Sequence, residues 1–255
     1  MAQIVAVLNQ KGGVGKTTTA INLGAYLAKA GHSVLIVDLD PQANATSGLG
    51  IDKQALDTTM YDVLFGGVGA EQITQSTTTP KLSLLPANAN LAAAEVDLAN
   101  EEDRELKLKA ALANLTYDYI FIDCPPALGL LSINALGAAN RVLIPVQAEY
   151  YALEGLTQLL STIQRVRSGI NPHLELLGVV ITMYDSRTTL AEQVVDELKK
   201  HFGDKVFDSV VPRNVRLAEA PSYGKSIAEH DKWSKGARAY KNLAKEVEKE
   251  LSNKN

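Results

Sequence analysis

The stretch Lys11-Gly12-Gly13-Val14-Gly15-Lys16-Thr17-Thr18 decides the fold of this chain of 255 residues. It directly follows an apolar run over residues 4–8 and opens a helical pattern over residues 16–30. Glycines let the backbone N–H groups of such a loop point inward at phosphate oxygens, and the following helix adds the positive end of its dipole. The sequence therefore predicts a phosphate-binding loop at a strand-to-helix junction.

The side chains of the loop indicate its ligand. Lys16 supplies a positive charge for the β- and γ-phosphates of a nucleotide, and the Thr17 hydroxyl is placed to hold Mg²⁺. We therefore expect ATP with Mg²⁺ as the ligand. The nucleotide-binding residues expected from the loop are Lys11, Gly12, Gly13, Val14, Gly15, Lys16, Thr17 and Thr18.

Lys11 departs from the usual pattern of such loops. The pattern GxxxxGK[ST] requires glycine at position 10, whereas this chain has Gln10 followed by a second lysine. With Lys16 serving the bound nucleotide, Lys11 at the outer edge could reach phosphate bound to a second protomer, as an arginine finger does. The alternative is a solvated lysine that tunes the local field.

The rest of the chain alternates short apolar runs with helical patterns, which predicts right-handed βαβ units. We expect an α/β fold with a doubly wound, mostly parallel sheet and helices on both faces, in a single domain over residues 1–255. Gly31 and Gly169 are expected to cap the first and fifth helices. The expected strands are residues 4–8, 34–37, 82–85, 119–122, 141–146, 176–182 and 206–211, and the expected helices are residues 16–30, 91–98, 104–115, 132–139, 152–167, 190–201 and 237–251.

Composition excludes several classes of protein. With 46% hydrophobic and 21% charged residues, the chain is neither disordered nor collagen-like. The single cysteine, Cys124, is too few for a cysteine-built metal or cluster site and is expected to be a small buried residue. The start has no basic region of a signal peptide, and no apolar stretch reaches the ~18 residues of a membrane span. We therefore expect a soluble, cytoplasmic protein without a membrane partner.

Basic residues gather late in the chain. Residues 205–245 contain nine basic and four acidic residues, although the whole chain has a formal net charge of −4. Such a stretch is either a solvated helical surface or a binding surface for a polyanion. The charge count alone leaves both open.

The phosphate loop resembles the deviant loop of the ParA/MinD group of ATPases, in which the early lysine contacts nucleotide across a face-to-face dimer. Residues 37–42 (VDLDPQ) resemble the first switch motif of that group, and residues 121–126 (FIDCPP) resemble its Walker B and second switch motif. Residues 149–155 (EYYALEG) and 211–221 (VPRNVRLAEAP) are similar to late segments of the chromosome-partitioning ParA/Soj branch.

Three aspartates follow predicted strands, where α/β sheets place ligand sites. Asp123 is expected to hold the water shell of Mg²⁺. Asp38 and Asp40 are two residues apart and could project on the same side of an extended segment. The resemblance implies that Asp40 orients and helps activate the attacking water, whereas Asp38 either assists around Mg²⁺ or caps a turn. Turn chemistry is the alternative for each of them.

Pro212 and Asn214 correspond to adenine-contacting positions in the resemblance. An amide such as that of Asn214 can read a donor and an acceptor on a purine edge. The alternative for Asn214 is a helix cap.

The resemblance implies a DNA-partitioning ATPase. An ATP-bound homodimer would bind double-stranded DNA without sequence preference, and hydrolysis, stimulated by a ParB-type centromere-binding protein, would release it. This implies a nucleoid-associated location. The basic stretch supplies phosphate contacts, and the resemblance adds Arg187, Arg216 and Lys225 as DNA-binding residues, each with surface charge as the alternative.

A MinD-like, membrane-cycling ATPase is the alternative function. It requires an amphipathic C-terminal helix, and Leu243, Val247 and Leu251 do form an apolar stripe. The surrounding acidic residues favour packing of this stripe on the sheet. Among metabolic relatives, the nitrogenase iron-protein type needs two cysteines per subunit and is excluded, and we identify no small-molecule acid site of a ligase-type relative.

Overall fold

A seven-stranded sheet runs through the computed structural model, which describes residues 2–149 and 154–252. The strand order is β3-β4-β2-β5-β1-β6-β7, and every pairing except the short β3–β4 pair is parallel. This confirms the predicted α/β fold with a mostly parallel sheet. The strands are β1 (Gln3–Val7), β2 (Val34–Asp38), β3 (Gln75–Ser76), β4 (Leu82–Leu85), β5 (Tyr119–Asp123), β6 (Arg141–Gln147) and β7 (Glu175–Thr182).

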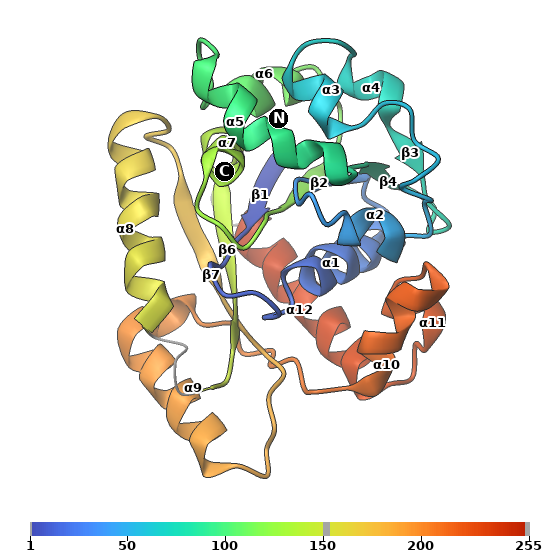
Figure 1. Cartoon of the computed structure of the whole chain (residues 1–255). Helices are drawn as coiled ribbons and strands as arrows, with labels where there is room; N and C mark the ends of the chain where they lie inside the picture. The colour runs from blue at the N-terminus through green and yellow to red at the C-terminus, as the bar shows by residue number, and fades with distance from the viewer. Residues whose placement is uncertain (1, 150–153, 253–255) are drawn as a thin grey trace.

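Helices cover both faces of the sheet, as Figure 1 shows. The longer helices are α1 (Lys16–Ala30), α7 (Leu130–Ala138), α8 (Glu154–Gly169), α9 (Thr189–Phe202) and α12 (Lys235–Ser252). The shorter ones are α2 (Asn44–Gly48), α3 (Met60–Leu64), α4 (Ala70–Ile73), α5 (Ala94–Asp97), α6 (Lys107–Leu112), α10 (Val215–Glu219) and α11 (Ile227–His230). One core contains α1 and α12, and the other contains α7, α8 and α9.

The strands alternate their side chains between these two cores. Val5 and Val7 of β1 belong to the core of α1 and α12, whereas Ala6 and Leu8 belong to the other. Because both faces are buried, a strand here needs apolar residues at every position. This is why the strands appear in the sequence as unbroken apolar runs.

The prediction of a strand over residues 206–211 is wrong. Phe207 N–H and Val211 N–H, four residues apart, donate to Val179 O and Ile181 O of β7, which are only two residues apart. The segment between them bows away from the sheet. There the N–H groups of Asp208 and Ser209 donate to Glu246 Oε2 of α12, at 2.9 and 3.3 Å, so a side chain replaces the strand ladder.

Two predicted helices are shorter than expected. Residues 91–98 form α5 between two short 3₁₀ turns, and only Lys107–Leu112 of residues 104–115 form α6. Glu95 of α5 accepts hydrogen bonds from the N–H groups of Leu130 and Leu131 at 2.7 and 3.2 Å, so this short helix caps the start of α7.

Helix ends follow the prediction in part. Gly31 caps α1 with a φ of 111°, and its N–H donates to Ala28 O at 3.0 Å. Gly169 is instead the last residue of α8. The expected start of that helix, at residues 152–153, lies outside the described residues.

The apolar stripe of the last helix is buried. Leu243, Val247 and Leu251 of α12 lie in the core that α1 shares with the sheet, as the pattern of the tail favours. Across residues 2–149 and 154–252, no helix has both the length and the apolar character that a bilayer crossing needs.

Candidate nucleotide site

The phosphate loop joins the end of β1 to the start of α1, and its conformation requires two glycines. Gly13 and Gly15 have φ values of 73° and 86°, in the left-handed region that other residues rarely adopt. Gly15 is the N-cap of α1, where Thr19 N–H donates to Gly15 O at 2.9 Å. Gly12 is different, because its φ lies outside that region and a Cβ added there would meet no described residue within 4 Å.

Neighbouring strands hold the loop in place. Thr182, the last residue of β7, donates its hydroxyl hydrogen to Val14 O at 2.8 Å. Asn9 donates from Nδ2 to Pro145 O of β6 at 2.7 Å and accepts Lys11 N–H at 3.0 Å. We did not predict a role for Thr182 or Asn9. Each is a polar residue at the end of an apolar strand, and this position was the one feature of the sequence that could have indicated a role at the loop.

Lys16 lies almost buried beneath the loop. Its Nζ donates to Lys11 O at 3.2 Å, and only 7% of the residue is exposed. Burial lowers the pKa of the Lys16 ammonium, and the negative charge of Asp123 opposes this. The result is a cation kept close to the backbone of the loop, where the phosphates of a nucleotide would lie.

Asp123 ends β5 next to this lysine and is fully buried. Neither carboxylate oxygen accepts a hydrogen bond from the described residues. Burial and the nearby charge of Asp38 raise the pKa of Asp123 well above its usual range, and the Thr17 hydroxyl lies close enough to oppose the rise in part. A buried carboxylate without a partner is costly, which suits it to a cation and its water shell.

Asp38 ends β2 directly opposite Asp123 in the sheet register. Its Oδ2 accepts the N–H and the hydroxyl hydrogen of Thr46, both at 2.7 Å, and its Oδ1 accepts Asp40 N–H at 3.2 Å. Oδ2 therefore ties α2 to the sheet, and Oδ1 holds the turn that follows β2. Of the two roles expected for Asp38, this geometry is that of a turn cap.

Asp40 is 8% exposed and lies between β2 and α2. Its Oδ1 accepts Gln42 N–H at 2.9 Å, and its charge opposes the lowering of the Lys16 pKa. The site thus brings Asp38, Asp40 and Asp123 to one edge of the sheet beside the loop.

Among the described residues no cluster of three or more His, Cys, Asp or Glu side chains could hold a metal ion. Mg²⁺ here would rely on Thr17, phosphate and water.

A cavity of about 200 Å³ adjoins the loop at Gly15 and Thr18, and Pro212 and Asn214 line it. The Asn214 side chain is the N-cap of α10, because its Oδ1 accepts Leu217 N–H at 3.3 Å. The capping alternative is therefore observed. It uses the amide oxygen, so the amide nitrogen is the group that can face a ligand.

Cys124 next to Asp123 is buried, as expected, and burial raises the pKa of its thiol.

Lys11 forms an ion pair within its own chain. Its Nζ lies 2.9 Å from Glu149 Oε2, with both side chains partly exposed. No pattern in the sequence pointed to Glu149 as the partner of Lys11. Glu149 begins the predicted segment 149–155, of which residues 150–153 lie outside the described residues.

The arginines expected at DNA are exposed and already paired with acids. Arg187 donates to both carboxylate oxygens of Asp185, from Nε at 2.8 Å and from Nη2 at 2.7 Å. Arg216 of α10 donates to Glu219 at 2.9 Å and lies 3.7 Å from Asp231. The two arginines flank a short pairing in which Tyr184 N–H donates to Val211 O and Arg213 N–H donates to Tyr184 O.

Lysines from distant parts of the chain line a second surface. Lys225 is exposed before α11. A cavity of about 440 Å³ is lined by Lys29, Lys232, Trp233, Lys241 and Lys245, together with residues of α1, α11 and α12. Trp233 is 78% exposed, and Lys232 Nζ lies 5.1 Å from the centre of its ring. The sequence indicated the late lysines but not Lys29, which the fold adds from α1.

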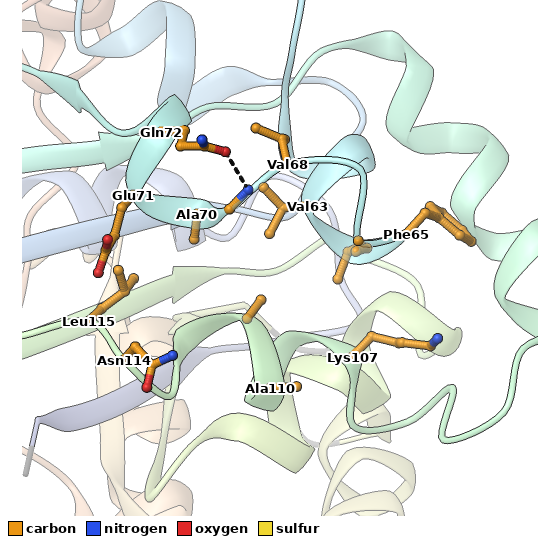
Figure 2. Close-up of a pocket in the computed structure, with 14 residues that line it drawn as sticks. Val63, Phe65, Val68, Ala70, Glu71, Gln72, Lys107, Ala110, Asn114 and Leu115 are labelled. Atoms are coloured by element: carbon orange, nitrogen blue, oxygen red, sulfur yellow. Dashed lines mark hydrogen bonds between the residues drawn. The ribbon is translucent and has the colours of Figure 1, made fainter.

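A cavity of about 700 Å³ lies elsewhere, between α3, α4 and α6 (Figure 2). Small and apolar side chains line much of it, and Gln72 accepts Gly69 N–H at 2.9 Å as part of a helix cap. None of the loop residues or the three aspartates lines it. It is therefore separate from the candidate nucleotide site.

Comparison with known proteins gives consistent matches. Residues 2–176 match a family model described as an AAA domain. The chain is 55% identical to the sporulation initiation inhibitor protein Soj of Bacillus subtilis over 97% of this chain and 98% of that protein. It is 51% identical to the chromosome partitioning protein ParA of Caulobacter vibrioides, over 96% and 93%. A crystal structure of cobyrinic acid a,c-diamide synthase from Mycobacterium smegmatis with bound ADP and magnesium aligns with a TM-score of 0.88 and 39% identity, over 100% of this chain and 97% of that one.

Proposed function

The chain belongs to the ParA/Soj family of chromosome-partitioning ATPases. From this premise we propose that residues 1–255 act as one ATPase domain that binds ATP with Mg²⁺, closes into a homodimer, and then holds double-stranded DNA without sequence preference. Hydrolysis of ATP to ADP and phosphate opens the dimer and releases the DNA. Such a protein would be cytoplasmic and associated with the nucleoid.

The buried carboxylate of Asp123 is the observation that carries the nucleotide part. It lies buried beside Lys16 and Thr17, with no hydrogen bond to either carboxylate oxygen from the described residues, and a cation with its water shell would stabilise its charged form. Residues 12–18 would hold the phosphates through their backbone N–H groups, with Thr17 on Mg²⁺ and Asp123 on its waters. The magnesium ion would draw charge from the transferred phosphoryl group.

Asp40 is our candidate for orienting the attacking water. It lies beside the loop, and its Oδ1 accepts Gln42 N–H, which fixes the carboxylate in place. A carboxylate held by its own turn can present its other oxygen to a water without a large rearrangement. Pro212 and Asn214 would contact adenine in the adjoining cavity.

DNA binding is supported by the distribution of charge. Arg187, Arg216 and Lys225 are exposed, and further lysines line the cavity beside Trp233. A dimer presents each of these residues twice. Because each neutralised phosphate releases counterions, doubling the contacts makes binding depend strongly on dimerisation.

A second protein would set the timing of release. The family implies a ParB-type centromere-binding partner that accelerates an otherwise slow hydrolysis. A membrane-cycling role is less well supported, because the apolar stripe of α12 is already buried in the core.

The test compares three variants by ATP turnover and by sedimentation with ATP and Mg²⁺. Asp40→Ala should form a stable ATP dimer with turnover reduced by at least ~100-fold, since removal of a general base or water-orienting group costs about 10²–10⁴ in rate. Lys16→Ala should bind no ATP and remain monomeric. The exposed Asp52→Ala serves as the control and should match wild type. Wild-type turnover in Asp40→Ala would refute its catalytic role.

A further inference from the structure

The ion pair between Lys11 and Glu149 joins the phosphate loop to the end of β6. Lys11 Nζ lies 2.9 Å from Glu149 Oε2, and the side chains are 42% and 46% exposed. β1 and β6 are neighbouring parallel strands, so the loop after one and the turn after the other lie side by side. Lys11 is therefore neutralised within its own subunit.

Contacts on both sides hold this pair in place. Glu149 Oε1 accepts a hydrogen bond from Gln147 Nε2, and Glu149 N–H donates to Gln147 O at 2.8 Å, which fixes the carboxylate against the end of β6. On the other side, Lys11 N–H donates to Asn9 Oδ1, and Asn9 Nδ2 donates to Pro145 O. Glu149 and Lys11 are thus each held at the end of β6 by hydrogen bonds that do not involve the ion pair itself.

The pair has a consequence for dimer closure, and this inference rests on the proposed role of Lys11 across the dimer. The ammonium can serve the phosphates of the partner's nucleotide only if it leaves Glu149. A triphosphate in a closed interface offers more negative charge than one exposed carboxylate, and water exclusion strengthens that attraction. The phosphates therefore win the competition only when a loaded partner is present.

We propose that Glu149 is a positioning residue for Lys11. It holds the lysine at the outer edge of the loop, away from the subunit's own phosphates, and releases it when the nucleotide of a second subunit takes its place. The carboxylate thereby raises the concentration of loaded subunits at which the dimer closes.

The test is the dissociation constant of the ATP dimer of Glu149→Gln, measured by sedimentation with a non-hydrolysable ATP analogue and Mg²⁺. One exposed ion pair stabilises by a factor of about 1.4 to 5, and a symmetric dimer breaks two of them. The dissociation constant should therefore fall by about 2- to 25-fold relative to wild type. Wild type and variant are compared at the same pH. The substitution removes the charge of the Glu149 side chain and preserves its size.

A matched control removes the same charge elsewhere. Glu197→Gln breaks an exposed Lys–Glu pair of 3.0 Å with Lys200 on α9, and it should leave the dimer constant at the wild-type value. In a Lys11→Ala background, Glu149→Gln should have no effect, because the group on which it acts is absent. A simple change of net charge would instead act equally in both backgrounds.

The outcomes separate this inference from the proposed function. An unchanged or weakened dimer in Glu149→Gln, with wild type dimerising normally, would overturn the role of Glu149 alone. A wild-type protein that stays monomeric with the ATP analogue would instead refute the proposed function itself. Tighter dimerisation in both lysine backgrounds would also overturn the inference, because Glu149 would then act without Lys11.

Discussion

Asp123 shows how one residue can be costly to the fold and useful to the site. Its carboxylate is buried next to Asp38, and both causes raise its pKa above the value that it has in the unfolded chain. A carboxyl group with a raised pKa binds its proton more tightly in the folded state, so folding stability falls as pH rises above about 4. Near neutral pH this aspartate therefore lowers the stability of the protein without nucleotide.

Asp123→Asn should consequently stabilise the nucleotide-free protein at neutral pH. We expect the melting temperature at about pH 7.5, roughly one unit above the unperturbed pKa of histidine, to rise by about 2–4 °C for each kcal/mol gained. The gain should vanish below about pH 3, where the aspartate is protonated in both the folded and the unfolded chain. Calorimetry across this pH range measures it.

Asp118→Asn is the control of opposite sign. Ser33 donates to the Asp118 carboxylate from its N–H and its hydroxyl, which lowers the pKa of Asp118. Its contribution to stability is present at neutral pH and is lost as pH falls through its folded pKa. A lower melting temperature for Asp123→Asn at neutral pH would contradict the assigned cost.

Among the helices and strands, the sequence predicts those whose conformation depends only on neighbouring residues. The phosphate loop, the six longer strands and α1 follow from glycines and unbroken apolar runs, because both are set within a few residues. The segment 206–211 carries the same apolar pattern, but Glu246 of α12 takes its N–H groups. Helices of four or five residues, such as α2 and α10, are too short to show a period.

The candidate site likewise contains some features set by local sequence and others set by contacts between distant segments. Loop residues were recognisable, whereas the contacts of Asp38 with Thr46 and of Lys11 with Glu149 join segments that only the folded sheet brings together. Asn214 shows a further limit, since one side chain can cap a helix and line a ligand cavity at once. No sequence pattern separates those two roles.

The phosphate loop provides a prediction at this scale through Gly12. Its φ does not require glycine, and a Cβ added there meets nothing within 4 Å among the described residues. Gly12→Val should therefore fold and bind ATP with near wild-type affinity, yet fail to dimerise because it crowds the facing loop. Nucleotide titration and sedimentation measure the two steps separately.

Gly169→Val is the matched control, because a Cβ added there also meets nothing within 4 Å in the part of the chain that the structure describes. It should dimerise normally. If Gly12→Val formed a normal ATP dimer, the loops could not face one another as closely as the role of Lys11 requires.

At the scale of the whole molecule, charge is distributed unevenly around an acidic chain. The formal net charge is −4, yet the exposed arginines and the lysine-lined cavity concentrate basic groups on the late part of the chain. Acidic partners on Arg187 and Arg216 hold those side chains in place and compete with phosphate. Such a surface is suited to binding DNA reversibly, because the acidic partners can take the arginines back when the DNA leaves.

Arg187→Ala and Arg216→Ala should each weaken binding to duplex DNA of any sequence while leaving the ATP dimer intact. Each arginine that contacts one phosphate contributes about 0.9 to the slope of log affinity against log salt, and a dimer carries two copies. The slope should therefore fall by about 1.8 in magnitude for each substitution. Loss of the dimer in either variant would indicate a structural role instead.

The central claim is that ATP closes a dimer and that the dimer holds DNA. The most direct measurement is the affinity of Asp40→Ala for a duplex of arbitrary sequence at about 100 mM salt, first with ATP and then with ADP. We expect tight binding with ATP that weakens steeply as salt rises, and no comparable binding with ADP. Equal binding in both nucleotides, or none in either, would contradict a nucleotide-gated DNA switch.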